Sequence, residues 1–237
     1  MTVVCACALV YPVRAAAQVA PTDAERKAYR GLFAAAAQGD AAAISLLLRR
    51  RVDVNAHDGH GRTPLMVAVY NSHDRAAVAL LRGGADPNLL DADRYDVVTI
   101  AAVANDAAMI RLVLGRGARA TNITSPYDGT ALIAAAHLGN VAAVRELIHG
   151  GAPLNHVNNL GWTALLEAVI LGDGGTHHQQ VVRLLLDAGA DRTVADRGGM
   201  TPLDHARARR YDTIVKLLTA ATRRTTRRTR ASGRDMA

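Results

Sequence analysis

Apolar residues along the chain gather in two kinds of short block, each introduced by polar residues. Residues 63–69 read Thr-Pro-Leu-Met-Val-Ala-Val, and a Leu-rich block further on ends in Gly-Gly-Ala at residues 83–85. A Thr hydroxyl can accept hydrogen bonds from free N–H groups at a helix start, and Pro in the first turn has a φ suited to a helix. Gly after a Leu-rich block ends a helix where a left-handed residue is needed. The pattern predicts two short antiparallel helices followed by a loop.

Both blocks recur along the chain. The first block starts at Arg30, Thr63, Asp96, Thr130, Thr163 and Thr201, which are spaced 33, 33, 34, 33 and 38 residues apart. The Leu-rich block recurs at 80–88, 112–118, 147–155 and 184–191. Turn dipeptides between units, at 58–59, 128–129 and 198–199, predict hairpin turns. A repeat of this length predicts a stacked helical array of about six units.

Composition supports an all-α fold. Half of the 237 residues are apolar, with one Phe, one Trp and six Tyr, so the core is built from small and aliphatic side chains. Such a core favours tightly packed helices over a β-sandwich or barrel, which would use β-branched and aromatic residues. The length allows one elongated domain or two small ones.

Over residues 28–220 the chain resembles the ankyrin-repeat family, whose pattern is G-x-T-P-L-H-x-A-A, then a Leu-rich helix and G-A-D. The resemblance implies an all-α solenoid of stacked helix–turn–helix units with β-hairpin loops. It also implies a non-catalytic protein–protein interaction module that binds a partner protein on its concave surface. The family's His is absent here, its place being taken by Met66, Thr99, Ile133, Leu166 and Asp204. We therefore expect apolar packing to replace its hydrogen bonds, and an irregular repeat at 96–99 and 121–127.

The resemblance further implies that the variable positions of the loops and first helices contact the partner. These are Tyr70, Leu90, Asp91, Asp93, Val103, Tyr127, His137, Leu138, Asn158, Asn159, Trp162, Ile170, Leu171, Asp196 and Arg197. The alternative is that several are partly buried under the loops. Residues 172–180 lengthen one unit and are expected to form a surface loop, which either touches the partner or is merely tolerated.

The chain ends differ from the repeats. Residues 1–17 resemble a secretory signal peptide, which predicts a periplasmic or secreted protein, with a cytoplasmic one as the alternative. Residues 18–27 are expected to form a linker and the start of a capping helix. Residues 221–237 are an Arg-rich tail that carries most of the net charge of +7, so the body is nearly neutral. No transmembrane segment is expected in the mature chain, because about 20 apolar residues are needed to span a bilayer.

Catalytic and cofactor chemistry is not predicted. The adjacent His177 and His178 lack the spacing that places two imidazoles on one helical face, so no metal site is expected. Both cysteines, Cys5 and Cys7, fall inside the first 17 residues, so a processed chain has no thiol chemistry. We expect no enzyme activity, no cofactor and a protein partner. Two alternatives stay open: a secreted effector acting on host proteins, and an Arg-rich tail that binds nucleic acid or an anionic membrane. Nucleic acid is not the expected partner of the nearly neutral body.

Overall fold

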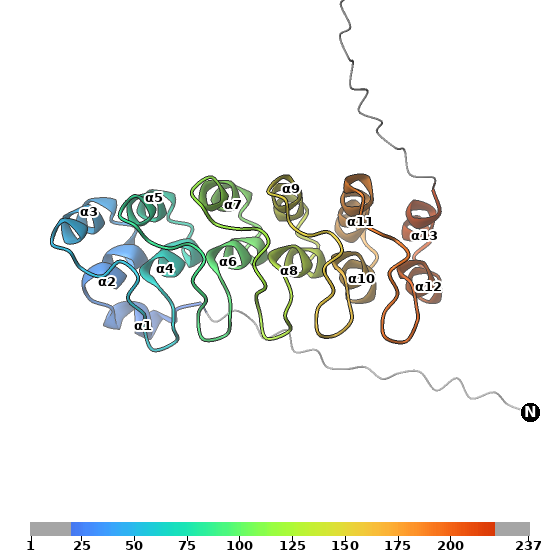
Figure 1. Cartoon of the computed structure of the whole chain (residues 1–237), viewed down its shortest axis with the longest axis horizontal. Coiled ribbons are helices and arrows are strands. Elements are labelled where there is room, and N and C mark those ends of the chain that lie inside the picture. The colour runs from blue at the N-terminus through green and yellow to red at the C-terminus, as the bar shows by residue number, and fades with distance from the viewer. Residues whose placement is uncertain (1–19, 221–237) are drawn as a thin grey trace, which may run out of the picture. The chain divides into compact units, whose positions relative to one another are not determined.

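The computed structural model describes residues 20–220 (Figure 1). These residues form two compact units, an N-terminal unit of residues 20–96 and a C-terminal unit of residues 97–220. The predicted repeat region, 28–220, spans both. The predicted signal peptide, the two cysteines and the Arg-rich tail lie outside the described residues.

The N-terminal unit holds one short capping helix and two helix pairs. Its helices are α1 (Asp23–Ala28), α2 (Gly31–Gln38), α3 (Ala41–Arg49), α4 (Pro64–Tyr70) and α5 (Asp74–Arg82). The first helices of the pairs, α2 and α4, pack on one another, and the second helices, α3 and α5, do the same in a separate layer. The helix α1, which falls where a capping helix was predicted, packs against α2.

The C-terminal unit holds four helix pairs. Its helices are α6 (Val97–Val103), α7 (Ala107–Leu114), α8 (Ala131–His137), α9 (Val141–His149), α10 (Ala164–Ile170), α11 (Thr176–Ala188), α12 (Pro202–Ala208) and α13 (Asp212–Thr219). The first helices, α6, α8, α10 and α12, form one layer, and the second helices, α7, α9, α11 and α13, form the other (Figure 1). We call the second helices of each unit its outer helices.

The first helices begin where the sequence predicted. The hydroxyl of a capping threonine accepts a hydrogen bond of 3.2–3.3 Å from the backbone N–H three residues later, at Thr63, Thr130, Thr163 and Thr201. Such a cap contributes about 1 kcal/mol. Pro64 and Pro202 follow two of these threonines in the first turn. The apolar residues after the caps point into the core, where Leu65, Leu132 and Leu165 have no exposed surface.

Buried Met66, Ile133 and Leu166 fill the place of the missing histidine by apolar packing, as expected, and hydrogen bonds between neighbouring repeats come from another position. A side chain at the start of an outer helix donates to a carbonyl oxygen near the end of the preceding repeat's first helix. The bonds are His73 Nε2 to Ala37 O (3.1 Å), Asn140 Nδ2 to Ala102 O (2.9 Å), His178 Nε2 to His137 O (3.0 Å) and Tyr211 Oη to Gly172 O (3.0 Å). These carbonyls lie at helix ends, which lack a partner within the helix. The ties therefore link each of these repeats to the one before it.

The loops between repeats, which we call fingers, comprise residues 57–62, 90–95, 123–129, 157–162 and 195–200. In four of them a side-chain Oδ1 accepts hydrogen bonds from the N–H groups two and four residues later, at Asp58, Asp91, Asn158 and Asp196. The finger 123–129 lacks this side chain and carries a β-bridge from Thr124 to Gly129. This irregular finger overlaps the stretch 121–127 that departs from the repeat pattern. The predicted hairpins at 58–59 and 198–199 are thus turns with side-chain support, and the one at 128–129 is closed by the β-bridge.

The lengthened unit does not form the surface loop that we expected over residues 172–180. Residues 172–175 make the connection, and α11 already begins at Thr176. The extra residues therefore extend a helix by one turn at its N-terminus. The turn is held in place because His178 bonds both the preceding repeat and the carboxylate of Asp173, at 2.8 Å.

None of the helices within residues 20–220 combines the length and the apolar character that crossing a bilayer requires.

Candidate protein-binding surface

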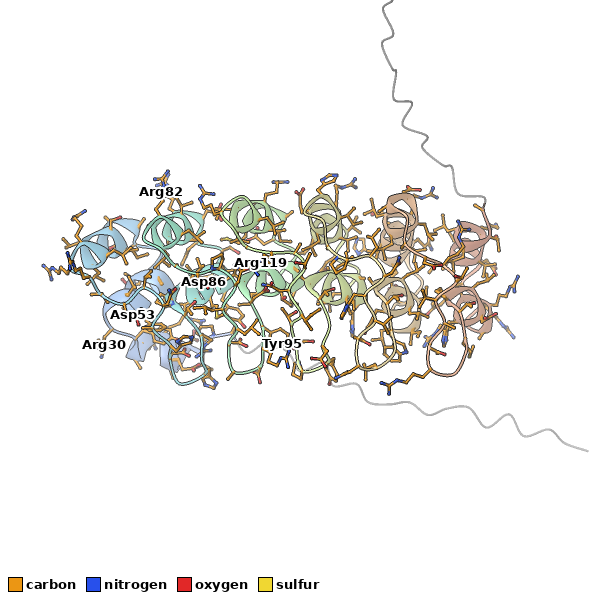
Figure 2. All side chains as sticks on the ribbon, viewed as in Figure 1. Arg30, Asp53, Arg82, Asp86, Tyr95 and Arg119 are labelled. Carbon is orange, nitrogen blue, oxygen red and sulfur yellow. The ribbon has the colours of Figure 1, made fainter. Side chains whose placement is uncertain are left out.

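In each unit the fingers extend from the layer of first helices on the side opposite the outer helices (Figure 1). In the N-terminal unit, Tyr95 lies on the finger side and Arg82 on the outer-helix side (Figure 2). In the C-terminal unit we define the finger–palm surface as the fingers 123–129, 157–162 and 195–200 with the palm residues 103, 137–138 and 170–171.

The predicted partner-binding residues differ in how far they reach this surface. Exposed side chains belong to Leu90 and Asp93 in the N-terminal unit and to Leu138, Asn159 and Arg197 in the C-terminal unit. Half-buried side chains belong to Tyr70, Val103, Tyr127, His137, Trp162, Leu171 and Asp196. Asp91, Asn158 and Ile170 are buried. The buried three shape the surface from below, since Asp91 and Asn158 hold finger turns and Ile170 belongs to the core.

Three apolar residues at the fingers were not among the predicted set. Ile123, Val157 and Met200 expose 39%, 46% and 37% of their surface. Ile123 and Val157 stand at the same repeat position as Leu90, at intervals of 33 and 34 residues. The repeat spacing could therefore have identified them once Leu90 was chosen. Leu138 is 46% exposed. Together with Ile123, Val157 and Met200, it gives the C-terminal unit more exposed apolar groups than the predicted set contained.

Neighbouring fingers of the C-terminal unit are tied to one another. The backbone N–H of Asn159 donates to Tyr127 O at 2.9 Å, and its side-chain amide donates to Pro126 O at 3.1 Å. Arg197 reaches across from the next finger to Asn159 O at 2.5 Å. These bonds limit the freedom of the loops before any partner binds, which lowers the entropy cost of binding.

A buried carboxylate on α10 and a half-buried carboxylate within a finger pair with histidines in the C-terminal unit. Glu167 on α10 is 4% exposed and accepts from Asn158 Nδ2 at 3.0 Å. Its other oxygen lies 3.2 Å from His137 Nδ1. In the next repeat His205 Nε2 lies 2.7 Å from Asp196 Oδ2. Burial raises the pKa of Asp196, but hydrogen bonds from Met200 N–H and His205 outweigh it, so this pKa falls below its ordinary value.

The first finger of the N-terminal unit is anchored by a buried cation. Arg62, whose side chain is 1% exposed, bonds Asp58 at 2.7 Å and Glu25 on α1 at 2.5 Å. Tyr29 donates to the same Asp58 carboxylate at 2.6 Å. Burial raises the pKa of Asp58, but the hydrogen bonds from Tyr29 and Arg62 lower it by more, so the net shift is downward. This network pins the capping helix to the first finger.

The dependence of the free energy of unfolding on acidic pH should reflect this network of hydrogen bonds. Hydrogen bonds from Thr22, and then Arg62, lower the pKa of Glu25 from 4.5 to about 2. A depressed folded-state pKa contributes stability that is present above pH 4.5 and lost as the pH falls toward 2. We expect Glu25→Gln to lower the free energy of unfolding at neutral pH and to flatten its decline between those values. Urea unfolding followed by circular dichroism across this range tests it; equal slopes in both proteins would exclude the role of Glu25.

Two buried polar groups of the N-terminal unit have raised pKa values, one at the end of α4 and one in the finger 90–95. The Tyr70 hydroxyl is buried without a hydrogen-bond partner, and burial raises the pKa of Tyr70 above its ordinary value. Burial also raises the pKa of Asp91. Both residues were predicted to contact a partner, and that contact stays a prediction.

No cluster of three His, Cys, Asp or Glu side chains suited to a metal ion occurs within residues 20–220. Of the adjacent histidines, His178 uses both ring nitrogens in structural bonds, to Asp173 and to the His137 carbonyl. Its chemistry is therefore that of a tie between repeats.

A two-layered array of short helix pairs with side-chain-supported fingers defines a helical repeat protein of the kind that binds through its surface. A family model described as ankyrin repeats (3 copies) matches residues 11–91, 98–196 and 150–228. The chain belongs to the ankyrin-repeat family. Ankyrin-repeat domains are protein–protein interaction modules, and members of the family are in general non-catalytic.

The chain is similar to known proteins, among them two named as ankyrin-repeat proteins. The ankyrin repeat protein YahD of Escherichia coli strain K12 is 35% identical over 188 residues, which cover 79% of this chain and 93% of YahD. An ankyrin repeat domain from Acinetobacter baumannii AYE is 46% identical with a TM-score of 0.75, over 79% of this chain and 95% of that domain. A chain of the complex between the predatory endopeptidase Bd0816 of Bdellovibrio bacteriovorus and the immunity protein Bd3460 is 26% identical with a TM-score of 0.67, over 80% of this chain and 97% of that one.

Proposed function

We propose that the chain binds a partner protein through the finger–palm surface of its C-terminal unit. The observation that carries the proposal is the exposure of Ile123, Leu138, Val157 and Met200 on fingers and a palm that hydrogen bonds hold in place. Exposed apolar residues rimmed by polar ones are typical of protein-binding sites. The surface has a preformed backbone, so little ordering is required when a partner arrives.

The binding energy is expected to concentrate in a few side chains. Burial of apolar surface contributes roughly 25 cal/mol per Å², and Trp is favoured among the residues that dominate interfaces. The half-buried Trp162 ends the finger that contains the exposed Val157, so it can contribute a large contact area. Arg197 and Asn159 form the polar rim that gives direction to the contact.

The Bdellovibrio neighbour supports a protein partner, because it comes from a complex of two proteins. Within the N-terminal unit we propose Tyr70, Leu90 and Asp93 as a separate contact set at equivalent repeat positions. A secreted effector that holds a host protein would use the same residues. A tail that binds nucleic acid would instead show capture that falls steeply with salt.

Capture from extracts of the native cell by the immobilised chain tests this function. We expect the affinity for the partner to fall by more than about tenfold in a double variant, Leu138→Ser with Val157→Ser. Two interface residues whose substitution each lowers the binding free energy by over about 1 kcal/mol together exceed that factor. The matched control is Leu46→Ser on the outer helix α3, because Leu46 is 44% exposed and lies outside the proposed surface.

Circular dichroism checks that all variants remain folded. Equal capture by the wild type and the folded double variant would contradict the finger–palm surface as the binding site. Loss of capture by Leu46→Ser alone would place the contact on the outer helices.

A further inference from the structure

His137, a palm residue, pairs with a buried carboxylate through one of its two ring nitrogens. His137, at the C-terminal end of α8, has a side chain that is 27% exposed, and its Nδ1 lies 3.2 Å from Oε2 of Glu167. The Glu167 side chain is only 5% exposed. One ring nitrogen of His137 is therefore committed to the protein, while Nε2 has no hydrogen-bond partner among the described residues.

The direction of this bond is fixed by the residues on the other side of Glu167. Asn158 Oδ1 accepts from the N–H groups of Leu160 and Trp162, so its other amide atom, Nδ2, is left to donate. It donates to Glu167 Oε1 at 3.0 Å. A carboxylate can only accept hydrogen bonds, so Oε2 requires a proton on Nδ1 of His137. The backbone of the finger thus determines, through Asn158 and Glu167, which nitrogen of His137 carries the proton.

We propose that Glu167 locks His137 in the tautomer protonated at Nδ1, so that the palm presents Nε2 to a partner as an acceptor that becomes a cationic donor on acidification. This inference rests on the proposed function, since it describes the chemistry of the same surface. The fitting partner group is an N–H or O–H donor while His137 is neutral. After protonation Nε2 donates, and the fitting group is a carboxylate or a carbonyl oxygen.

Few other charges can act on His137. The helices that pack on α8 are α6, α9 and α10. Helix α6 carries no titratable side chain, and Glu167 is the only one on α10. On α9, Arg145 and His149 are exposed, and Glu146 pairs with Arg111. His178 of α11 contacts the carbonyl oxygen of His137 rather than its ring, and itself pairs with Asp173.

Nitrogen-15 NMR of the histidine rings tests the tautomer without any partner. In the wild-type chain at a pH where His137 is neutral, we expect the Nδ1–H pattern for this residue. His205 serves as an internal reference in the same spectrum, because its Nε2 faces Asp196 and should carry the proton. In Glu167→Gln the amide oxygen stays with Asn158 Nδ2, so the new NH₂ group faces Nδ1. The variant should therefore shift His137 to the Nε2–H tautomer and leave His205 unchanged.

An Nε2–H pattern for His137 in the wild type would overturn the proposal. So would a folded Glu167→Gln variant in which the tautomer of His137 is unchanged from the wild type. If that variant fails to fold, the wild-type spectrum still decides. Once a partner is captured, its affinity should change with pH along the titration curve of His137, and His137→Leu should remove that dependence. If His137 is protonated at Nδ1 in the wild type and at Nε2 in Glu167→Gln, but no partner is captured, the binding function is contradicted. The control of the His137 tautomer by Glu167 then still stands.

Discussion

Replacing Arg62 with Met is expected to destabilise the N-terminal unit by about 3–5 kcal/mol, because it leaves a buried carboxylate without its cation. The side chain of Asp58 is 9% exposed and is shared between Arg62 and Tyr29. Without the guanidinium, the capping helix also loses its bond through Glu25. The loss should appear as faster amide hydrogen exchange in α1 and in the finger 57–62.

The matched control for Arg62 is Arg75→Met, since Arg75 on α5 is exposed and the change removes the same group. An exposed charge contributes about 0–1 kcal/mol, so this variant should exchange like the wild type. Equal behaviour of the two variants would mean that the buried network contributes no more than a surface ion pair.

Leu165→Ala is expected to destabilise the C-terminal unit by about 2–5 kcal/mol, the cost of a cavity at a fully buried leucine. Leu165 lies in the first turn of α10, between α8 and α12, and has no exposed surface. Trp162, the only tryptophan in the chain, lies three residues away and reports on the same unit. Urea unfolding followed by its fluorescence should therefore show a midpoint at lower denaturant.

Leu138→Ala removes the same atoms from an exposed position on the neighbouring repeat. Its effect is expected to stay within about 0.5 kcal/mol. A similar loss in both variants would show that burial in the helix layers does not govern the stability of this unit.

The helices were predictable because they depend on local chemistry repeated at a fixed interval. Thr63, Thr130, Thr163 and Thr201 cap the first helices as their sequence context indicates. The stretch 121–127 was also predictable as irregular, since it departs from the repeat pattern, and its finger is held by a β-bridge instead of an Asp or Asn side chain. Each of these features involves residues within a few positions of one another.

Features that depend on residues far apart were not predictable from one sequence. The ties from His73, Asn140 and His178 join atoms 36 to 41 positions apart, so no local pattern indicates them. The burial of Arg62 was not indicated either, because its partner Glu25 lies 37 positions away. The same holds for residues 176–180, which extend α11 because His178 is held by the preceding repeat.

The candidate surface was predictable by position and less so by burial. The family resemblance indicated positions at the loops and the ends of the first helices, including Leu138, Trp162 and Arg197, and their contact with a partner stays a prediction. It did not indicate that Asn158 would turn inward, because that depends on the carboxylate of Glu167 beneath it. A polar finger residue is directed inward or outward by its neighbour in the helix layer.

Amide hydrogen exchange of the C-terminal unit, with and without the captured partner, tests the central claim most directly. We predict slower exchange in the fingers 123–129, 157–162 and 195–200 and at the ends of α8 and α10, with the outer helices α9, α11 and α13 unchanged. Slower exchange confined to the outer helices, or no change in the fingers, would contradict binding through the finger–palm surface.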